Sequence, residues 1–370
     1  MKIAFLCKRQ YMSKDVIIDK YARLYEIPNQ LALLGHQVEC FCLSYQSHDE
    51  GSWSDSNDSK SLIWHSKSYR GIKKVGILIY PFFLLQKLKQ FQPDIIITAS
   101  DIPHIVWGAW CAKKLNIPFV ADLYDNFEGF GQARILGMKQ LLRKAVCQAQ
   151  LVLTTSQPLA DLVQNKYNAK GKVISMPSSV DTCIFRKGNK IKSREELQLS
   201  LNKLYIGTAG GLYRDKGVEV IYQAWKILEK EIPNVYLVIA GPYEPDYPPP
   251  QGERVIYLGS LTHSKVATLF QALDVGIISI LDTPFGRYCF PQKAYEMLAC
   301  NLPVVVADIG EMSYLFKDIP QALFEAGNAQ DLADKLKQQL QNSCYSYAKV
   351  KNWSEIIQQI EPVIVSIKRG

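Results

Sequence analysis

Lys293 and Glu296 carry opposite charges three residues apart, within a segment, 290–308, whose pattern predicts a helix followed by a buried strand. Pro291 suits the first turn of that helix, because its missing N–H leaves nothing unsatisfied there. Residues three apart share one helix face, and the free N–H groups at a helix N-terminus favour an anion such as a phosphate. The lysine therefore suits a phosphate and the glutamate suits ribose hydroxyls. The alternative is a solvated surface pair, which is what most isolated Lys–Glu pairs are.

A glycine-rich turn, Gly207–Gly217, follows one predicted strand and opens the next predicted helix at Val218. Glycines in such a turn let backbone N–H groups approach a pyrophosphate closely, and Arg214 and Lys216 add positive charge. Taken alone, the turn is equally consistent with a tight connection between a strand and a helix. The turn by itself is therefore weak evidence for a phosphate site.

Three polar residues of the first half lie where a predicted parallel sheet would bind a ligand. Tyr124 and Asp125 follow the predicted strand 119–123, and His104 lies at the start of a predicted helix. Ligands of open α/β sheets bind at the carboxyl ends of the strands. Asp125 either contacts a ligand hydroxyl or caps the next helix. A lone histidine such as His104 is more often structural than a ligand contact.

The segment that begins at Pro291 resembles the C-terminal signature of the retaining GT-B glycosyltransferases of family 4 (group 1), in the variant Pro-Asn-Lys-Leu-Phe-Glu-Tyr-Met-Ala. Pro291, Lys293, Glu296 and Ala299 are in register with that signature. Lys216-Gly217 matches the Lys-Gly pair of the family's phosphate loop, and the resemblance spans nearly the whole chain. It implies an α/β protein of the GT-B fold, with two Rossmann-like parallel-sheet domains facing each other across a cleft.

The resemblance also assigns residues to roles. The loop 286–290 is expected to present backbone amides to the donor sugar. The implied catalytic residues are Lys216, Glu296 and Asp125. The implied donor-binding residues are Gly210, Gly211, Arg214, Lys216, Tyr288, Phe290, Pro291, Gln292, Lys293 and Glu296. The implied sugar or acceptor contacts are His104, Tyr124 and Asp125.

Three positions depart from the family pattern. The arginine of the phosphate loop falls on Gly211, the first of two glutamates eight positions apart falls on Tyr288, and the pair Tyr124-Asp125 replaces a common histidine. Arg214 is expected to reach the same phosphate from another backbone position. Beside the transferase, the departures leave open an inert GT-B homologue that binds a nucleotide or a partner, and a sugar epimerase that needs no acceptor.

The reaction implied by the resemblance moves a sugar from a nucleotide diphosphate sugar, UDP- or GDP-linked, to a saccharide or lipid-linked saccharide acceptor. It retains the anomeric configuration, and the expected setting is surface polysaccharide assembly. No cofactor or metal is expected, because the chain has no Asp-x-Asp triplet and basic groups supply the positive charge. A nicotinamide-dependent Rossmann enzyme is excluded, because residues 7–12 contain no glycine after the first strand.

The elements that must position these residues alternate between strand and helix patterns, which predicts parallel sheets covered by helices. The predicted strands are 2–7, 37–43, 95–99, 119–123, 151–155 and 172–176, then 204–208, 235–240, 255–258, 275–279 and 304–307. Residues 45–60 read as a polar loop, and Asn301 as a left-handed helix cap. The predicted domains are 1–186 and 204–345, joined by a hinge at 187–203, with a final helix at 346–370 that crosses back to the first domain.

Composition is that of a folded protein, with 48% apolar and 21% charged residues and a formal charge of +8. Nine cysteines lie scattered in apolar contexts, which predicts buried thiols in a reducing compartment, the cytoplasm. The basic excess suits phosphate-bearing ligands and lipid headgroups, and no nucleic-acid-binding motif is present.

A basic, apolar segment predicts a possible contact with an anionic membrane, on the inner face of the plasma membrane. Lys73, Lys74, Lys87 and Lys89 flank the uncharged residues 75–85. Eleven residues cannot span a bilayer, but a basic amphipathic helix can lie at its interface. The alternative is a core-packed helix with solvated lysines at its ends.

Overall fold

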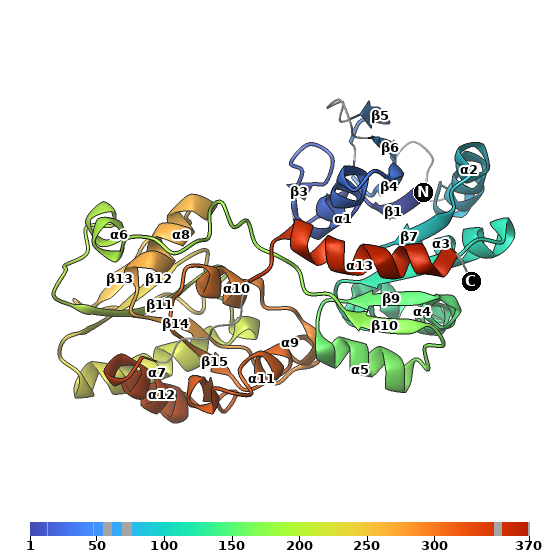
Figure 1. Cartoon of the computed structure of the whole chain (residues 1–370). Helices are drawn as coiled ribbons and strands as arrows, with labels where there is room; N and C mark the ends of the chain where they lie inside the picture. Colours follow the sequence, from blue (N-terminus) through green and yellow to red (C-terminus); the bar gives the residue numbers. More distant parts are fainter. Residues whose placement is uncertain (13, 47, 55–60, 69–75, 344–349, 369–370) are drawn as a thin grey trace. The chain divides into compact units, whose positions relative to one another are not determined.

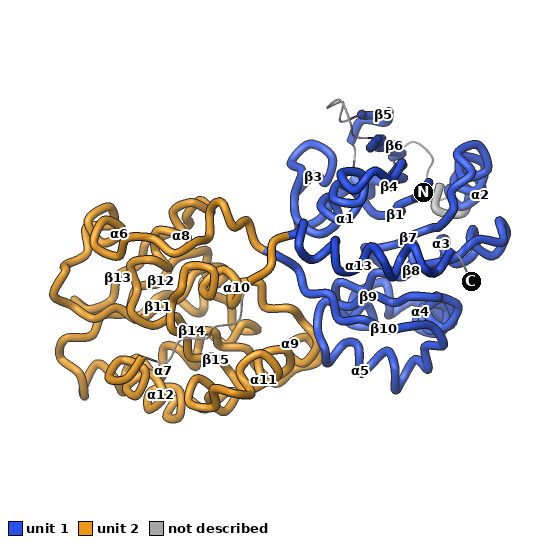
Figure 2. Tube along the Cα trace, in the orientation of Figure 1, with its two compact units in different colours: residues 1–179, 353–370 blue, residues 180–352 orange. Residues whose placement is uncertain are grey.

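The computed structural model describes residues 1–12, 14–46, 48–54, 61–68, 76–343 and 350–368. The chain forms two compact units, residues 1–179 with 353–370 (unit 1) and residues 180–352 (unit 2) (Figure 2). The division between them falls after Ser179, a few residues before the predicted hinge. None of the helices in the described part of the chain has the length and apolar character needed to cross a bilayer.

Unit 1 is built on an eight-stranded sheet in the order β10-β9-β8-β7-β1-β4-β6-β5, parallel except for the edge strand β5 (Figure 1). Its strands are β1 (Lys2–Lys8), β4 (Gln37–Ser44), β5 (Gly51–Ser54), β6 (Leu62–Ser68), β7 (Ile95–Thr98), β8 (Phe119–Leu123), β9 (Leu151–Thr154) and β10 (Lys172–Ser175), beside the hairpin β2 (Gln10–Tyr11) and β3 (Lys14–Asp15). Its helices are α1 (Ala22–Leu33), α2 (Gly76–Phe91), α3 (Ile102–Leu115), α4 (Met138–Gln148), α5 (Gln157–Lys166) and α13 (Trp353–Lys368), with 3₁₀ turns η2 (Phe127–Gly129) and η3 (Gly131–Arg134).

Unit 2 is built on a fully parallel six-stranded sheet in the order β13-β12-β11-β14-β15-β16. Its strands are β11 (Leu204–Ala209), β12 (Val235–Ala240), β13 (Val255–Tyr257), β14 (Val275–Ile278), β15 (Val304–Ala307) and β16 (Leu323–Phe324). Its helices are α6 (Lys190–Glu196), α7 (Val218–Glu231), α8 (His263–Ala272), α9 (Pro284–Tyr288), α10 (Gln292–Ala299), α11 (Glu311–Leu315) and α12 (Ala329–Gln341), with 3₁₀ turns η4 (Arg214–Lys216) and η5 (Pro320–Ala322).

Both sheets follow from continuous apolar runs, since a parallel strand is covered on both faces. The four residues of β15 are all buried, and so are the four of β7. In unit 2 one apolar cluster lies on the side of α8 and α10 and another on the side of α7 and α12. In unit 1 the final helix α13 packs against α1, and residues from both helices join the same core (Figure 1).

A buried ion pair lies inside unit 1. The guanidinium of Arg23 on α1 donates to both carboxylate oxygens of Asp122 on β8, with its Nη2 2.6 Å from Oδ1. Its Nη1 donates to the carbonyl of Met176, just after β10, at 2.7 Å. Both charged side chains are fully buried, so the pair joins three elements of the unit where no water is available to solvate either charge.

The predicted loop 45–60 and the predicted hinge contain ordered elements. The 45–60 segment includes β5, and β6 was not predicted, because an edge pair with polar, half-exposed residues lacks the long apolar run of a central strand. Within the predicted hinge, α6 packs on α8 in unit 2. Arg194 of α6 is buried, and its Nη2 donates to Asp274 at 2.7 Å, which fixes this segment to the unit.

Candidate functional site

Helix α10 begins where the sequence predicts. Pro291 is the residue before its first turn, and Asn301, just beyond its end, has a φ of 57°, the left-handed conformation expected for a cap. Ala294 and Met297 are fully buried against the sheet. The helix therefore presents its opposite side and its N-terminus to the edge of unit 2 where the strands end.

Lys293 and Glu296 do not form a solvated surface pair. The ammonium of Lys293 donates to Thr208 Oγ1 on β11 at 3.4 Å, and Gln292 Nε2 donates to Glu296 Oε1 at 3.3 Å. Burial lowers the pKa of Lys293 to about 8, an effect that Glu296 opposes and that the charge of Lys216 reinforces. Burial likewise raises the pKa of Glu296 to about 7, against the influence of Lys293 and Gln292. The site thus holds a poorly solvated cation that an anionic ligand would stabilise.

The glycine-rich turn after β11 lies directly beside Lys293. Gly210 has a φ of 108°, and a Cβ placed on it would lie 3.4 Å from Lys293 Nζ. Its amide donates to Ala240 at 2.9 Å, and the amide of Leu212 donates to the loop after β12 at 2.8 Å. A Cβ on Gly241 would lie 2.0 Å from the Gly210 carbonyl. The resemblance implies a phosphate contact for Gly210, yet its amide is engaged within the unit, and its positive φ is the reason that glycine suits this position.

Lys216 ends the turn η4 and reaches toward α9. Its ammonium lies 3.6 Å from the centre of the Phe285 ring, and its carbonyl accepts from Ser279 Oγ at 3.1 Å. Gly217, with a φ of 73°, then starts α7. Because the charge of Lys216 helps to lower the pKa of Lys293, the structure brings together two of the cations that the sequence predicts for a phosphate site.

Arg214 and Gly211 are turned to other partners. The guanidinium of Arg214 lies 5.7 Å from the centre of the Tyr247 ring, and its amide donates to Glu244 Oε2 at 3.1 Å. Gly211 lies under the ring of Tyr213, since a Cβ on it would approach that ring to 2.5 Å. In this conformation Arg214 packs on the loop after β12, so the prediction that it reaches the phosphate requires a change of rotamer.

The loop predicted at 286–290 is partly helical. Residues Pro284–Tyr288 form α9, capped by Thr283, whose side chain accepts from the amide of Gly286 at 3.1 Å. Tyr288 is therefore the last residue of a helix, and Phe290 packs on Tyr295 with ring centres 4.5 Å apart. Helical geometry directs the amides of residues 286–288 along the helix, so fewer of them are open to a sugar than a loop would offer.

His104 is enclosed in the interior of unit 1. Its Nδ1 lies 2.6 Å from Asp101 Oδ1, and the hydroxyl of Tyr45 donates to the other carboxylate oxygen at 2.9 Å. The rings of Tyr80 and Trp107 lie edge-on or tilted beside it, and its Nε2 has no hydrogen-bond partner within the described residues. His104 is 1% exposed, which favours the structural alternative, and its contact with a sugar or acceptor stays a prediction.

Tyr124 and Asp125 do lie at the carboxyl edge of the unit 1 sheet. The Tyr124 hydroxyl donates to the carbonyl of Ser100 at 2.8 Å, and Ser100 has a φ of 92°, uncommon for serine. Asp125 accepts from the amide of Asn126 at 2.7 Å, but the cap of η2 is Asn126. Lys8, which the sequence analysis did not select, lies here with its ammonium 5.8 Å from the Tyr124 ring centre. Its position at the end of the first predicted strand could have identified Lys8 as a candidate from the sequence.

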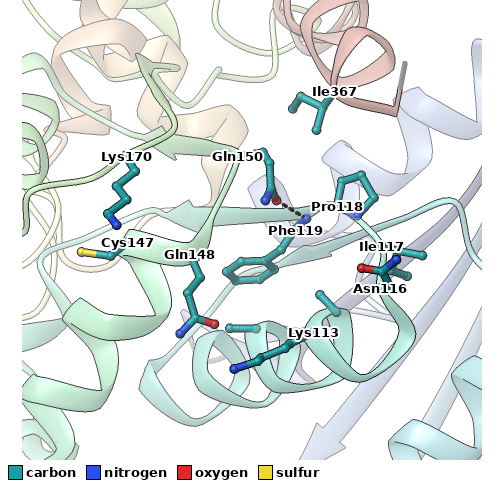
Figure 3. Close-up of a pocket in the computed structure, with 12 residues that line it drawn as sticks. Lys113, Asn116, Ile117, Pro118, Phe119, Cys147, Gln148, Gln150, Lys170 and Ile367 are labelled. Atoms are coloured by element: carbon teal, nitrogen blue, oxygen red, sulfur yellow. Dashed lines mark hydrogen bonds between the residues drawn. The ribbon is translucent and has the colours of Figure 1, made fainter. Parts of the chain in front are cut away.

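Two cavities of unit 1 lie at opposite edges of its sheet. The smaller, of about 370 Å³, is lined by residues at the carboxyl ends of β4 and β6, Cys42, Ser66 and Lys67, and by Tyr80 and Phe83 of α2. The larger, of about 720 Å³, lies at the amino edge between α3 and α4 and is lined by residues such as those labelled in Figure 3. Only the smaller one lies at the edge where parallel α/β sheets bind ligands.

Two family models match the chain. The model of the glycosyl transferases group 1 matches residues 203–342, and the model of glycosyltransferase family 4 matches residues 22–183. The chain is therefore similar to two glycosyltransferase families, each over less than half of its length. Between them the two matches include α10, the glycine-rich turn, the helix α3 that bears His104 and the strand β8 that precedes Tyr124.

The curated proteins that the chain resembles are distant from it in sequence. It is 26% identical over 244 residues to the D-inositol 3-phosphate glycosyltransferase of Stackebrandtia nassauensis, a match of 61% of this chain and 52% of that protein. It is 24% identical over 270 residues to the alpha-monoglucosyldiacylglycerol synthase of Streptococcus pneumoniae, with 68% and 58% covered. The chain thus spans between a half and two thirds of the length of these relatives.

Solved structures show that this chain has the GT-B fold. The sucrose-phosphate synthase of Thermosynechococcus elongatus matches with a TM-score of 0.65 at 17% identity, covering 100% of this chain and 97% of that chain. The Anabaena protein HepE, solved in complex with UDP, matches with a TM-score of 0.67 at 18% identity, covering 100% and 98%. At such identities the likeness concerns the fold.

Proposed function

We propose that the chain transfers a sugar from a nucleotide diphosphate sugar to a saccharide or lipid-linked saccharide acceptor. The observation that carries the proposal is the half-buried Lys293 ammonium beside Gly210, with Lys216 close enough to lower its pKa. Two cations and the N-terminus of α10 at one sheet edge form a favourable site for a diphosphate. Glu296, three residues further along the same helix, is then placed to accept hydrogen bonds from ribose.

The proposed reaction retains the configuration of the transferred sugar, and the leaving phosphate accepts the acceptor's proton as the glycosidic bond breaks. Negative charge then grows on the diphosphate in the transition state, where Lys216 and Lys293 stabilise it. Loss of one such preorganised group typically costs about 10²–10³ in rate. The two ammonium groups supply the charge that a bound metal ion supplies in other transferases, so the proposed reaction needs no metal.

The proposed donor and acceptor classes of this chain are inferred from the proteins that it resembles. HepE was solved with UDP, which supports a uridine or related diphosphate donor. The relative named alpha-monoglucosyldiacylglycerol synthase supports a lipid or lipid-linked acceptor. Asp125, Tyr124 and Lys8 at the carboxyl edge of unit 1 are the proposed contacts to the sugar or the acceptor. Surface polysaccharide assembly in the cytoplasm, with a nucleotide sugar as the one co-substrate, is the proposed setting.

Thermal unfolding tests the donor site directly. Wild type, Lys216→Ala and the matched control Lys226→Ala, an exposed lysine of α7, are each unfolded with UDP, GDP, ADP, CMP and dTDP. A nucleotide at 100 times its Kd adds about 2.7 kcal/mol, which raises Tm by several degrees. We expect a shift with one nucleotide that Lys216→Ala loses and the control keeps. No shift with any of them contradicts the proposal, and binding without turnover of any donor identifies an inert homologue.

A further inference from the structure

The smaller cavity of unit 1 has no role in the proposed reaction so far. It lies between the carboxyl ends of β4 and β6 and the helix α2, and its volume of about 370 Å³ is within the range of pockets that hold small ligands. Residues of β4, β6 and α2 line it together with residues of the edge strand β5. It is named here the Phe83 cavity, after one of the residues that line it.

Two ammonium groups lie beside one aromatic ring of the Phe83 cavity. Lys67 Nζ is 5.4 Å and Lys87 Nζ 6.0 Å from the centre of the Phe83 ring. Lys67 pairs with Glu50 at 2.6 Å, and this contact, with the amide of Ser68, lowers the pKa of Glu50, so that its carboxylate stays charged at neutral pH. Lys87 has no carboxylate partner within the part of the chain that the structure describes. One positive charge is therefore left to pair with an anionic group of a ligand.

Aromatic rings form much of the wall. Phe41 and His65 are partners across β4 and β6, and their rings stack with centres 5.1 Å apart. His65 Nε2 lies 3.1 Å from Glu39 Oε2, which fixes the imidazole in place. The rings of Tyr80 and Phe83 on α2 lie with centres 6.3 Å apart. The negative face of an aromatic ring attracts the slightly positive C–H groups of a sugar ring, so a wall of this kind suits a saccharide.

Tyr80 adds a hydrogen-bond donor that the protein itself does not use. The residue lines the cavity and is 6% exposed, and its hydroxyl has no hydrogen-bond partner among the described residues. Burial raises the pKa of Tyr80, and the largest further contribution comes from Cys42, which lines the same cavity. The hydroxyl therefore keeps its proton and lies near this wall. A buried donor without a partner is unfavourable, and an oxygen atom of a ligand would satisfy it.

Helix α2 places two of these groups. Phe83 and Lys87 are four residues apart and both line the cavity, whereas Lys89 is exposed and does not line it. Lys87 and Lys89 belong to the membrane contact predicted from the sequence, together with Lys73 and Lys74, which lie outside the described residues. That contact stays a prediction, and the position of Lys87 at the cavity does not depend on it.

The Phe83 cavity is separate from the contacts proposed for the reacting sugar. In the unit 1 sheet β4 and β6 lie on one side of β1, and β7 and β8 lie on the other. Since neighbouring strands are about 4.8 Å apart, the cavity is roughly 5–10 Å from the end of β1, where Lys8 lies, and roughly 15–20 Å from the end of β8, before Tyr124. An acceptor of more than one sugar residue could thus reach both places at the same sheet edge.

We propose that the Phe83 cavity binds a negatively charged sugar residue of the acceptor, remote from the bond that is formed. The sugar ring packs on Phe83, Lys87 pairs with the anionic group, and the Tyr80 hydroxyl donates to a sugar oxygen. The anionic group is the carboxylate of a uronate or a phosphate ester. The inference rests on the proposed transferase only in making this sugar part of the acceptor.

Ligand-observed NMR titration of the full chain tests the proposal, with D-glucuronate, glucose 6-phosphate and glucose as probes. Lys87→Met removes the charge and keeps the apolar stem, and Phe83→Leu removes the ring. Each variant has a matched control on the same helix. Lys89→Met removes an exposed charge outside the cavity, and Phe82→Leu removes a ring that is 66% exposed and does not line it.

We expect at least one charged sugar to bind more tightly than glucose. Lys87→Met should weaken that binding about tenfold, Phe83→Leu should weaken it as well, and both controls should keep it. A preference for glucuronate supports a uronate, and a preference for glucose 6-phosphate supports a phosphate ester. Equal binding of glucose and the charged sugars, or unchanged binding by Lys87→Met, overturns the proposal. Inorganic phosphate that binds as tightly as glucose 6-phosphate overturns it too, because the site then recognises an anion and no sugar.

Nucleotide-induced stabilisation, measured on the same variants, separates this inference from the proposed function. It is expected to stay unchanged, because the cavity lies in unit 1 and the proposed donor site in unit 2. Binding of a charged sugar without binding of any nucleotide supports the ligand class of the cavity and contradicts the transferase. Binding of a nucleotide without preference for a charged sugar overturns the inference about the cavity alone.

Discussion

Because Lys293 has a lowered pKa and a half-buried ammonium, we expect nucleotide affinity to fall steeply above neutral pH. Burial holds the pKa of Lys293 at about 8, below its ordinary value of 10.5, so the protein without ligand favours the neutral amine earlier than an exposed lysine would. A diphosphate beside the amine favours the charged form and raises that pKa. At pH values well below the pKa of Lys293 in the unliganded protein, the amine is already charged, so the affinity for the nucleotide does not depend on pH. As the pH rises through that pKa, the amine must take up a proton on binding and the affinity decreases.

The size of the effect follows from the titration. With a pKa of about 8 the charged fraction of Lys293 falls from about three quarters at pH 7.5 to about 3% at pH 9.5. The Kd for a nucleoside diphosphate should therefore rise about 20-fold over that interval. A phosphate group with its second pKa near 6 is fully ionised across the same range, so the ligand itself contributes little.

Isothermal titration of the nucleotide at pH 7.5, 8.5 and 9.5 measures this change, with Lys293→Met as the matched variant. Methionine keeps the length and apolar stem of lysine and removes the titrating group. The variant should bind more weakly at pH 7.5 and show little further change up to pH 9.5. If Lys293→Met shows the same 20-fold rise, another group titrates, and if wild type shows none, Lys293 does not contact the phosphate.

Three further substitutions test the structure around the site and the core. Asp122→Ala leaves the fully buried Arg23 without its carboxylate and should cost about 3–5 kcal/mol in urea unfolding, much of which a double apolar replacement should restore. Gly310→Ala places a Cβ at a φ of 58° and ψ of −133°, 2.7 Å from a carbonyl of α9, and should lower stability by about 1–3 kcal/mol in thermal unfolding. Gly210→Ala should weaken nucleotide binding about tenfold in calorimetry, because its Cβ crowds Lys293 Nζ.

The sequence predicts the central strands well because their signal is local. Strands such as 119–123 and 304–307 are continuous apolar runs, and the structure has them at those residues. Strand β5 at the sheet edge and its neighbour β6 were missed, since β5 is largely exposed and β6 alternates buried and half-buried residues instead of forming a continuous apolar run. The start of helix α1 at Ala22 has no such local signal, because Tyr21 before it provides no side-chain cap.

Predictions about the site were accurate for backbone and weaker for side-chain partners. The start of α10 and the left-handed Asn301 follow from residue types next to each other in the chain. The hydrogen bond from Lys293 to Thr208 joins residues 85 positions apart, so spacing within the motif contains no information about it. The enclosure of His104 by aromatic rings from α2 and α3 is likewise a tertiary property.

The replaced arginine of the phosphate loop has a physical consequence for the proposed reaction. Gly211 lies under the Tyr213 ring, and Arg214 packs on Tyr247, so the positive charge near the turn comes from Lys216 and Lys293. A half-buried ammonium is worth more to a growing negative charge than an exposed guanidinium, because it faces a lower local dielectric. In the unliganded protein, burial destabilises the charged form of this ammonium, which is why the pKa of Lys293 is lowered. If the proposed function is correct, a desolvated lysine replaces the missing arginine as the group that stabilises the diphosphate. The pH dependence of nucleotide binding then reports directly on the protonation of that lysine.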